Sequence, residues 1–175
     1  STFVLFGLLP VLIGTRFLRY FVAQSAVSPA EWKTGMAVTI PSLILFAAIA
    51  FALPSGLDGL RGVYPVDPGA MDSPALFLRH AILRVLPFYT AWEFFFRGFL
   101  LQGLRGSVSD TTAILIQTLP SALWHIRYPA SELYASVAGG LIFGWLALRT
   151  RSLLWPFFLH AGIGVITDLA ITCSR

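Results

Sequence analysis

Residues 36–53 read MAVTIPSLILFAAIAFAL, a run of 18 residues without a charged side chain. A helix needs about 20 predominantly apolar residues to cross the hydrocarbon core of a bilayer. A helix that is apolar on every side has no face suited to water, so it is buried in protein or in lipid. This stretch therefore predicts a transmembrane helix, and it sets the fold class for the rest of the chain.

Apolar runs of similar length recur on both sides of this segment. The expected spans are residues 2–21, 36–53, 75–103, 110–126, 132–149 and 152–171. The third run carries several charges, so its first part is expected at the membrane interface and its second part across the bilayer. The sequence thus predicts one all-α membrane-embedded domain, residues 1–175, built as a polytopic transmembrane helix bundle of about six helices.

The composition agrees with lipid as the solvent. Of the 175 residues, 57% are hydrophobic and only 11% are charged, against roughly 25% charged in soluble domains. The formal charge of +4 comes from basic residues that flank apolar runs, which is typical of membrane anchoring. The lipid bilayer is therefore an expected partner and nucleic acid is not. Cys173 is the only cysteine, which excludes an internal disulfide and a thiolate metal cluster.

The basic residues also predict an orientation. With the N-terminus outside, the inner face has Lys33, Arg105, Arg149 and Arg151 in its loops and Arg16 and Arg19 close by, whereas the outer face has Arg61, Arg127 and Arg175. The positive-inside rule favours this arrangement. On the expected helix 132–149, Ser136, Gly140 and Gly144 recur every four residues, a spacing that favours close packing against a neighbouring helix.

Four polar residues lie within the apolar runs: Glu93, Arg97, His125 and His160. A charge at the middle of a bilayer costs roughly 2.5–3.5 kcal/mol on insertion scales, so such residues are functional candidates. Glu93 and Arg97 are four residues apart on one helix face, with the acid first, the favourable order for an ion pair. The structural alternative is that this pair only offsets its own cost of burial.

Two histidines and a glutamate on three helices form a hydrolytic set. A carboxylate can take a proton from water, and imidazoles can hold that water or an oxyanion. Glu93, His125 and His160 are also residue types that bind zinc, so a divalent metal is a possible cofactor, although none is required. The chain contains neither the HExxH helix of soluble zinc peptidases nor the GxSxG turn of serine hydrolases.

The segments WEFFFRGFLLQGL, LPSALWHIRYPASE and GGLIFGWLALRTRSLLWPFFLHAGIGVITDLA resemble, in order and spacing, the CPBP family of intramembrane proteases. That family includes CAAX prenyl proteases and bacteriocin-related membrane proteins. The resemblance covers residues 80–172 as a protease core. It places Glu93 and Arg97 in the first family motif, His125 in the second and His160 in the third. It also implies an integral, multi-pass protein, expected in a bacterial cytoplasmic membrane.

The chain departs from the family pattern at three positions. Trp92 stands where the family has its first, water-activating glutamate, Ser121 replaces a phenylalanine, and Gly164 replaces a polar residue that would help bind the oxyanion. Two acids lie near the histidines. Glu132 could act as the base or only favour the start of a helix that Ser131 caps. Asp168 is expected to be a supporting residue or a polar helix end.

The residues and the resemblance together predict an intramembrane CAAX-type endopeptidase that cleaves a membrane-associated peptide or protein. In that prediction Glu93 activates water, His125 helps bind it, His160 stabilises the oxyanion and Arg97 holds Glu93. Glu93 is expected to face the cavity, with Trp92 packed outward. The alternative is a catalytically degenerate family member that binds a membrane peptide or partner without cleaving it, as an immunity protein does.

Overall fold

The computed structural model describes residues 28–174, and every regular element in that range is helical. In chain order the elements are α3 (Pro29–Ala52), η2 (Pro54–Leu60), η3 (Pro68–Met71), α4 (Pro74–His80), η4 (Ala81–Val85), α5 (Leu86–Glu93), η5 (Phe94–Leu101), α6 (Gln102–Leu104), α7 (Asp110–Leu123), α8 (Ala130–Thr150) and α9 (Leu154–Cys173). The all-α bundle is confirmed, whereas the predicted span at residues 2–21 lies outside the described residues.

Helix α3 contains almost all of the uncharged run of residues 36–53, but it starts earlier, at Pro29. Ser28 and Glu31 form a capping box: the Ser28 hydroxyl accepts from the Glu31 N–H (3.3 Å), and the Glu31 carboxylate accepts from the Ser28 N–H (2.6 Å). Proline suits the first helical position, where its missing N–H would have no partner. Capping stabilises the polar first turn of α3. A prediction based on the length of the apolar run therefore misses this turn.

The predicted segment 75–103 forms one long helix from Pro74 to Leu104, made of α4, η4, α5, η5 and α6 in succession. Ser73 caps its start by accepting from the Leu76 N–H (3.2 Å). The stretches Ala81–Val85 and Phe94–Leu101 are π-helical. Such wider turns are frequent at functional sites, and the second one directly follows Glu93.

Helices α7, α8 and α9 follow with short connections. Ser109 caps α7, and Arg151 ends α8 in the left-handed conformation at φ 51°. A Cβ atom on Gly140 would lie 2.6 Å from the Thr118 side chain, and one on Gly144 would lie 2.9 Å from Gln117. The glycines therefore let α7 and α8 approach closely, as their spacing predicts. Ser136 instead bonds within its own helix, to the Leu133 carbonyl (2.7 Å).

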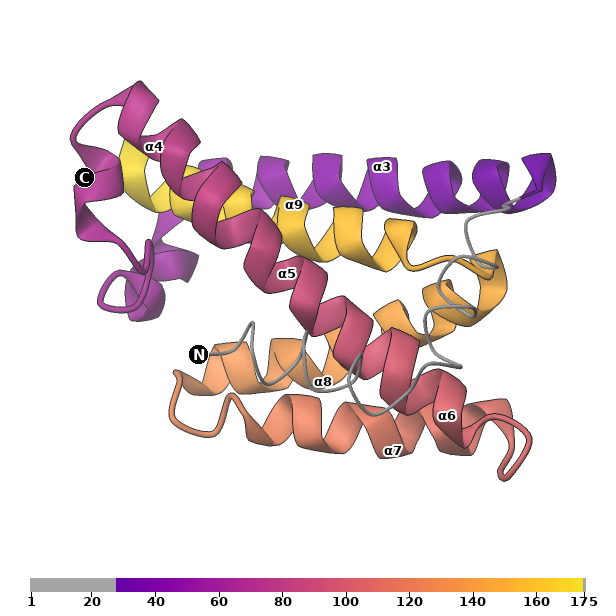
Figure 1. The fold of residues 1–175 in the computed structure, drawn as a ribbon. Coiled ribbons are helices and arrows are strands. Elements are labelled where there is room, and N and C mark those ends of the chain that lie inside the picture. The colour runs from indigo at the N-terminus through magenta and orange to yellow at the C-terminus, as the bar shows by residue number, and fades with distance from the viewer. Residues whose placement is uncertain (1–27, 175) are drawn as a thin grey trace.

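Figure 1 shows how these helices are arranged. Helices α3 and α9 lie side by side, as do α7 and α8, and the long helix α4–α6 runs diagonally from the first pair to the second. The start of α3, the α6–α7 loop and the α8–α9 turn lie at one end of the bundle. The η2–η3 connection, the α7–α8 turn and the C-terminus lie at the other end. The diagonal helix therefore touches both pairs and can bring residues from all of them together.

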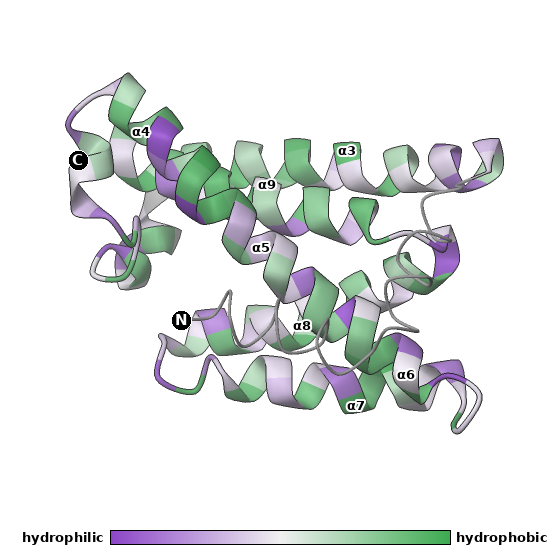
Figure 2. Cartoon of the chain, viewed as in Figure 1, coloured by the Kyte–Doolittle hydropathy of each residue, from purple (hydrophilic) through white to green (hydrophobic). Residues whose placement is uncertain are grey.

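Large apolar side chains remain exposed on the outside of the bundle. Ile44, Leu45 and Leu119 are more than 60% exposed, and Figure 2 shows that apolar residues predominate along α3 and α9. Soluble monomers rarely expose contiguous apolar surface on this scale. Helices α3, α8 and α9 are long and apolar enough to cross a membrane. The surface is therefore that of an integral membrane protein.

Candidate active site

A cavity of about 520 Å³ lies inside the bundle, lined by residues of α3, η2, α5, η5, α7, α8 and α9 and of the connections between them. Its wall is mostly apolar. The larger polar side chains in it are Tyr64, Tyr89, Arg97, His125, Tyr128, Glu132 and His160. His125 and His160 come from different helical hairpins, 35 positions apart in sequence, yet both line this one cavity. The prediction that the two histidines share a cavity is confirmed.

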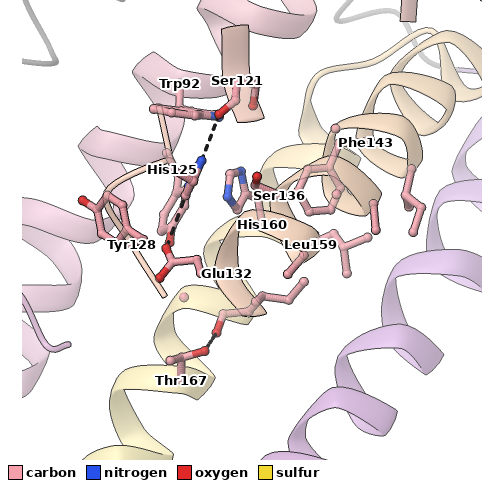
Figure 3. A pocket seen from close by; sticks show the side chains of 18 of the residues that line it. Trp92, Ser121, His125, Tyr128, Glu132, Ser136, Phe143, Leu159, His160 and Thr167 are labelled. Atoms are coloured by element: carbon pink, nitrogen blue, oxygen red, sulfur yellow. Dashed lines mark hydrogen bonds and ion pairs between the residues drawn. The ribbon is translucent and has the colours of Figure 1, made fainter. Parts of the chain in front are cut away.

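His125 and Glu132 form the first polar pair of the cavity: His125 lies in the α7–α8 turn and Glu132 in the first turn of α8. Figure 3 shows the two side chains pointing toward one another, with 3.8 Å between His125 Nε2 and Glu132 Oε1. His125 Nδ1 donates to the Ser121 carbonyl (2.9 Å), so in the neutral ring Nε2 carries the lone pair. A carboxylate oxygen and a ring nitrogen thus face each other across a gap that one water molecule can bridge.

Glu132 is further held by a tyrosine from the η2–η3 connection. The Tyr64 hydroxyl donates to Glu132 Oε1 at 2.6 Å. Burial raises the pKa of Tyr64, so the hydroxyl keeps its proton and acts only as a donor. The N-cap of α8 is Pro129 and makes no side-chain cap bond, so the alternative in which Ser131 caps this helix is wrong. Nothing in the sequence spacing points from Tyr64 to Glu132, 68 positions away.

His160 and Glu93 form the second pair, which links α9 to the long helix. His160 Nδ1 donates to Glu93 Oε1 at 2.6 Å, and Arg97 donates to the same oxygen at 3.1 Å. The side chains of Glu93 and Arg97 are each only 1% exposed, against 18% for His160. The predicted Glu93–Arg97 ion pair is therefore confirmed. Because the Glu93 carboxylate accepts from Nδ1, it also fixes the orientation of the His160 ring. Nε2 is then the ring nitrogen that can contact a ligand.

Trp92 lines the cavity, whereas Glu93 does not. The indole is 2% exposed, and its ring centroid lies 5.7 Å from that of His125 and 6.4 Å from that of His160. The expectation that Trp92 packs outward while Glu93 faces the cavity is wrong. Successive helical residues point about 100° apart, so when Trp92 faces the histidines, Glu93 is directed at α9.

Asp168 lies away from the cavity wall and bonds to His80 of α4. The distance from His80 Nε2 to Asp168 Oδ2 is 3.1 Å, and both side chains are buried. Neither residue lines the cavity. Asp168 therefore ties the end of α9 to α4. Its place as a supporting residue of the histidine site stays a prediction. No sequence pattern indicated His80, 88 positions away, as its partner.

The possible zinc set Glu93, His125 and His160 does not form a metal-binding arrangement. No group of three His, Cys, Asp or Glu side chains among residues 28–174 is placed to hold a metal ion. Glu93 Oε1 already accepts from His160 Nδ1 and from the Arg97 guanidinium. A guanidinium on a carboxylate competes directly with a cation for that oxygen. The residues do not fit a metal ligated by this set.

The fold and the cavity define a class of protein: a helical membrane protein with an apolar internal cavity lined by two histidines, each of which lies beside a carboxylate. Residues 74–166 match the family described as type II CAAX prenyl endopeptidase Rce1-like, so the chain belongs to this protease family. The match begins at the start of α4 and ends within α9, so it covers the long helix and both histidine pairs. Comparison with curated proteins found no match, and neither did comparison with solved structures.

Proposed function

We propose that this protein is an intramembrane endopeptidase that hydrolyses a peptide bond inside the cavity, with Glu132 as the general base. One observation carries this proposal: Glu132 is the only carboxylate among the residues that line the cavity in the described part of the chain. It also faces a histidine at water-bridging distance. The assignment moves the base from Glu93, the residue that the sequence favours, to the alternative that it leaves open.

In the proposed reaction a water molecule binds between Glu132 Oε1 and His125 Nε2. It donates one hydrogen to each, so its lone pair is free to attack the peptide carbonyl. The new C–O bond forms as the carbonyl π electrons move onto oxygen, and the proton passes to Glu132. When the C–N bond breaks, its electron pair leaves on nitrogen, which takes that proton from Glu132. The products are a carboxylic acid and an amine, and Glu132 is restored.

His160 is proposed to stabilise the negative charge on the carbonyl oxygen. With Nδ1 engaged by Glu93, only Nε2 can reach the substrate, and it donates when the ring is protonated. The Glu93 carboxylate compensates the charge of the protonated ring, and Arg97 holds that carboxylate in place. Donors fixed before the reaction are worth more than donors that must reorient during it. In this proposal Glu93 and Arg97 position His160 and do not contact the substrate.

The apolar wall suggests the class of substrate. Phe46, Leu57, Phe88 and Ile163 line the cavity around the polar pairs, which suits a peptide that carries a lipid chain or belongs to a membrane segment. We propose that the protein crosses the membrane several times and takes such peptides from the bilayer. A prenylated tail with a CAAX sequence is the first candidate because the family is described by that reaction.

The test is a cleavage assay with purified protein in detergent. The probes are a farnesylated CAAX peptide, the same peptide without the farnesyl chain, and a set of membrane-segment peptides, all read by mass spectrometry. His160→Asn prepared in parallel controls for contaminating proteases. We expect cleavage by the wild-type protein alone, unchanged by a metal chelator. Cleavage that a chelator abolishes would contradict the base mechanism, and no cleavage of any probe would contradict the peptidase.

A second function is favoured by one observation, the position of Trp92. The indole occupies cavity wall close to both histidines, where the family resemblance expects a carboxylate. A protein that binds a membrane peptide without cleaving it would tolerate this replacement. The assay above separates the two functions if binding of the farnesylated peptide is measured as well. Binding without cleavage would favour the non-enzymatic function.

A further inference from the structure

Gly164 and Tyr89 occupy one point in the cavity. Both residues line it, and a Cβ atom built on Gly164 would lie 2.5 Å from the Tyr89 hydroxyl oxygen and 2.6 Å from its ring. Any side chain at position 164 would therefore displace the tyrosine. The absence of a side chain on α9 allows the phenol of α5 to reach this point. The two residues act together, although they are 75 positions apart in sequence.

The Tyr89 ring also lies directly against His160. The ring centroids are 4.3 Å apart, with an interplanar angle of 53°. Phe88 packs against the same tyrosine at 5.2 Å in an edge-on arrangement. Gly164 is one helical turn after His160 on α9, so the hydroxyl is held at the level of the turn that follows the histidine. The structure thus places a phenol, packed between Phe88 and His160, next to the site where the proposed function stabilises the oxyanion.

The Tyr89 hydroxyl makes no hydrogen bond to the described residues, although it lies in the wall of a cavity that contains histidine and glutamate. A hydroxyl needs a partner when it is removed from water, and one that lacks a protein partner is available to a ligand. His160 can donate from Nε2 only when it is protonated, whereas a phenol keeps its proton up to about pH 10. Tyr89 therefore offers a donor that does not depend on the state of His160.

We propose that the Tyr89 hydroxyl is a catalytic residue: it donates a hydrogen bond to the oxyanion that forms when water attacks the peptide carbonyl, beside His160. This inference rests on the proposed function. Gly164 has no side chain that could donate a hydrogen bond at this point of the cavity. The Tyr89 hydroxyl, which comes from α5, supplies a donor there instead. In the step concerned, the carbonyl π electrons move onto oxygen, the Tyr89 O–H stays intact, and its hydrogen bond strengthens as the charge develops.

The first experiment measures kcat and KM of Tyr89→Phe on the farnesylated CAAX peptide. Phenylalanine keeps the ring packing on His160 and removes only the donor. Loss of one oxyanion donor costs roughly 10²–10³ in kcat, so we expect a fall of about 100-fold with KM little changed. Tyr134→Phe is the matched control, because Tyr134 is 73% exposed and lies outside the cavity wall; it should match the wild-type protein.

A second variant tests the same geometry from α9. Gly164→Ala should push the Tyr89 ring away and lower kcat, whereas Gly103→Ala, which adds a Cβ where nothing lies within 4 Å, should not. A third measurement compares binding of a phosphonate peptide, which mimics the tetrahedral oxyanion, with binding of the matching amide. Tyr89→Phe should weaken phosphonate binding far more than amide binding. The hydrogen bond from Tyr89 is stronger to the negatively charged oxygen of the phosphonate than to the neutral amide carbonyl. A variant that only unfolds would weaken both.

Three outcomes decide the inference. A wild-type-like kcat for Tyr89→Phe, in a protein that cleaves the peptide and loses cleavage in Glu132→Gln, would overturn the role of Tyr89 and leave the proposed function standing. Equal weakening of phosphonate and amide binding would also overturn it. Absence of cleavage by the wild-type protein would overturn the proposed function, and the role of Tyr89 in catalysis with it.

Discussion

Glu93 and Glu132 have the same carboxylate but different surroundings. Glu93 is 1% exposed and is bonded to Arg97 and His160. Glu132 lines the cavity, accepts from Tyr64 and faces His125. A carboxylate held by a guanidinium suits a structural or positioning role, whereas one that faces an imidazole across a gap suits water activation. The two acids should therefore respond differently to the same substitution.

Glu93→Gln should lower stability, because it leaves the buried Arg97 guanidinium without a countercharge. Removing one partner of a buried ion pair costs about 3 kcal/mol or more, so the midpoint of thermal unfolding in detergent should fall clearly. Glu132→Gln serves as the matched control. Glutamine still accepts from the Tyr64 hydroxyl, and this substitution leaves no buried cation without a countercharge. A Glu93→Gln protein as stable as the wild type would contradict the positioning role assigned to Glu93.

Tyr64→Phe should reduce turnover without preventing binding. The Tyr64 hydroxyl bonds to Glu132 Oε1 at 2.6 Å, and hydrogen bonds to charged groups contribute about 1.5–3 kcal/mol. Loss of this bond leaves Glu132 free to rotate away from His125, so we expect kcat to fall about 10-fold or more, with a smaller change in KM. Steady-state kinetics measure both values. Unchanged kinetics would show that Glu132 needs no support from the η2–η3 connection.

At this scale the sequence predicted the membrane histidines, the Glu93–Arg97 pair and the shared cavity, because burial cost and spacing are local properties. It did not predict Tyr64, Tyr89 or His80 as partners of the polar residues. Their contacts cross 68, 71 and 88 positions, and a tyrosine in an apolar chain is common enough to carry no signal. The direction of Trp92 depends on how the whole helix is rotated, which residue types do not reveal.

The elements of the bundle depend on small residues and caps as much as on apolar length. Ser28, Ser73 and Ser109 cap three helices, and Gly140 lets α7 contact α8. Gln117 crosses the same contact, since its Nε2 donates to the Gly140 carbonyl at 2.8 Å. The α7–α8 hairpin carries both His125 and Glu132. Its packing therefore sets the geometry of the proposed water site.

Gly140→Ala should destabilise the protein. The added Cβ would meet the Thr118 side chain at 2.6 Å, and overpacking of this kind costs typically 1–3 kcal/mol. Gly103→Ala is the control because its Cβ would meet nothing, and alanine favours a helix over glycine. Thermal unfolding in detergent compares the two. If Gly140→Ala were as stable as Gly103→Ala, the close approach of α7 and α8 would be contradicted.

The sequence predicted the five described helical segments by their apolar length, and it missed features of backbone geometry. It placed the start of α3 at residue 36 rather than at Pro29, because apolar counting overlooks a polar first turn held by caps. It also gave no indication of the π-helical stretch Phe94–Leu101. A π-helical turn is stabilised by its packing environment, so local composition does not encode it.

Across the whole molecule, the charged residues of the loops and helix ends lie at the two ends of the bundle, whereas Glu93 and Arg97 are buried inside it. Figure 1 places the start of α3, the α6–α7 loop and the α8–α9 turn at one end, and Arg151 there lies 3.7 Å from Glu31 of α3. Lys33, Arg105 and Arg149 belong to the same segments. This grouping is the one that the sequence assigns to the cytoplasmic face, and the orientation itself remains a prediction.

Labelling of single cysteines tests that orientation. In a Cys173→Ser background, Ser107→Cys and Ser55→Cys place neutral, exposed probes in the α6–α7 loop and in η2, at opposite ends of the bundle. A membrane-impermeant maleimide added to intact cells should label Ser55→Cys only. After permeabilisation it should label both. Labelling of Ser107→Cys alone in intact cells would reverse the orientation.

We propose Glu132 as the base of a peptidase, and turnover of the farnesylated CAAX peptide by Glu132→Gln is the measurement that checks this claim. Glutamine keeps the shape of the side chain and the bond from Tyr64 but cannot take a proton. We predict a fall in kcat of roughly 10²–10⁴, with the thermal unfolding midpoint unchanged. Turnover by Glu132→Gln at the wild-type rate would contradict the claim.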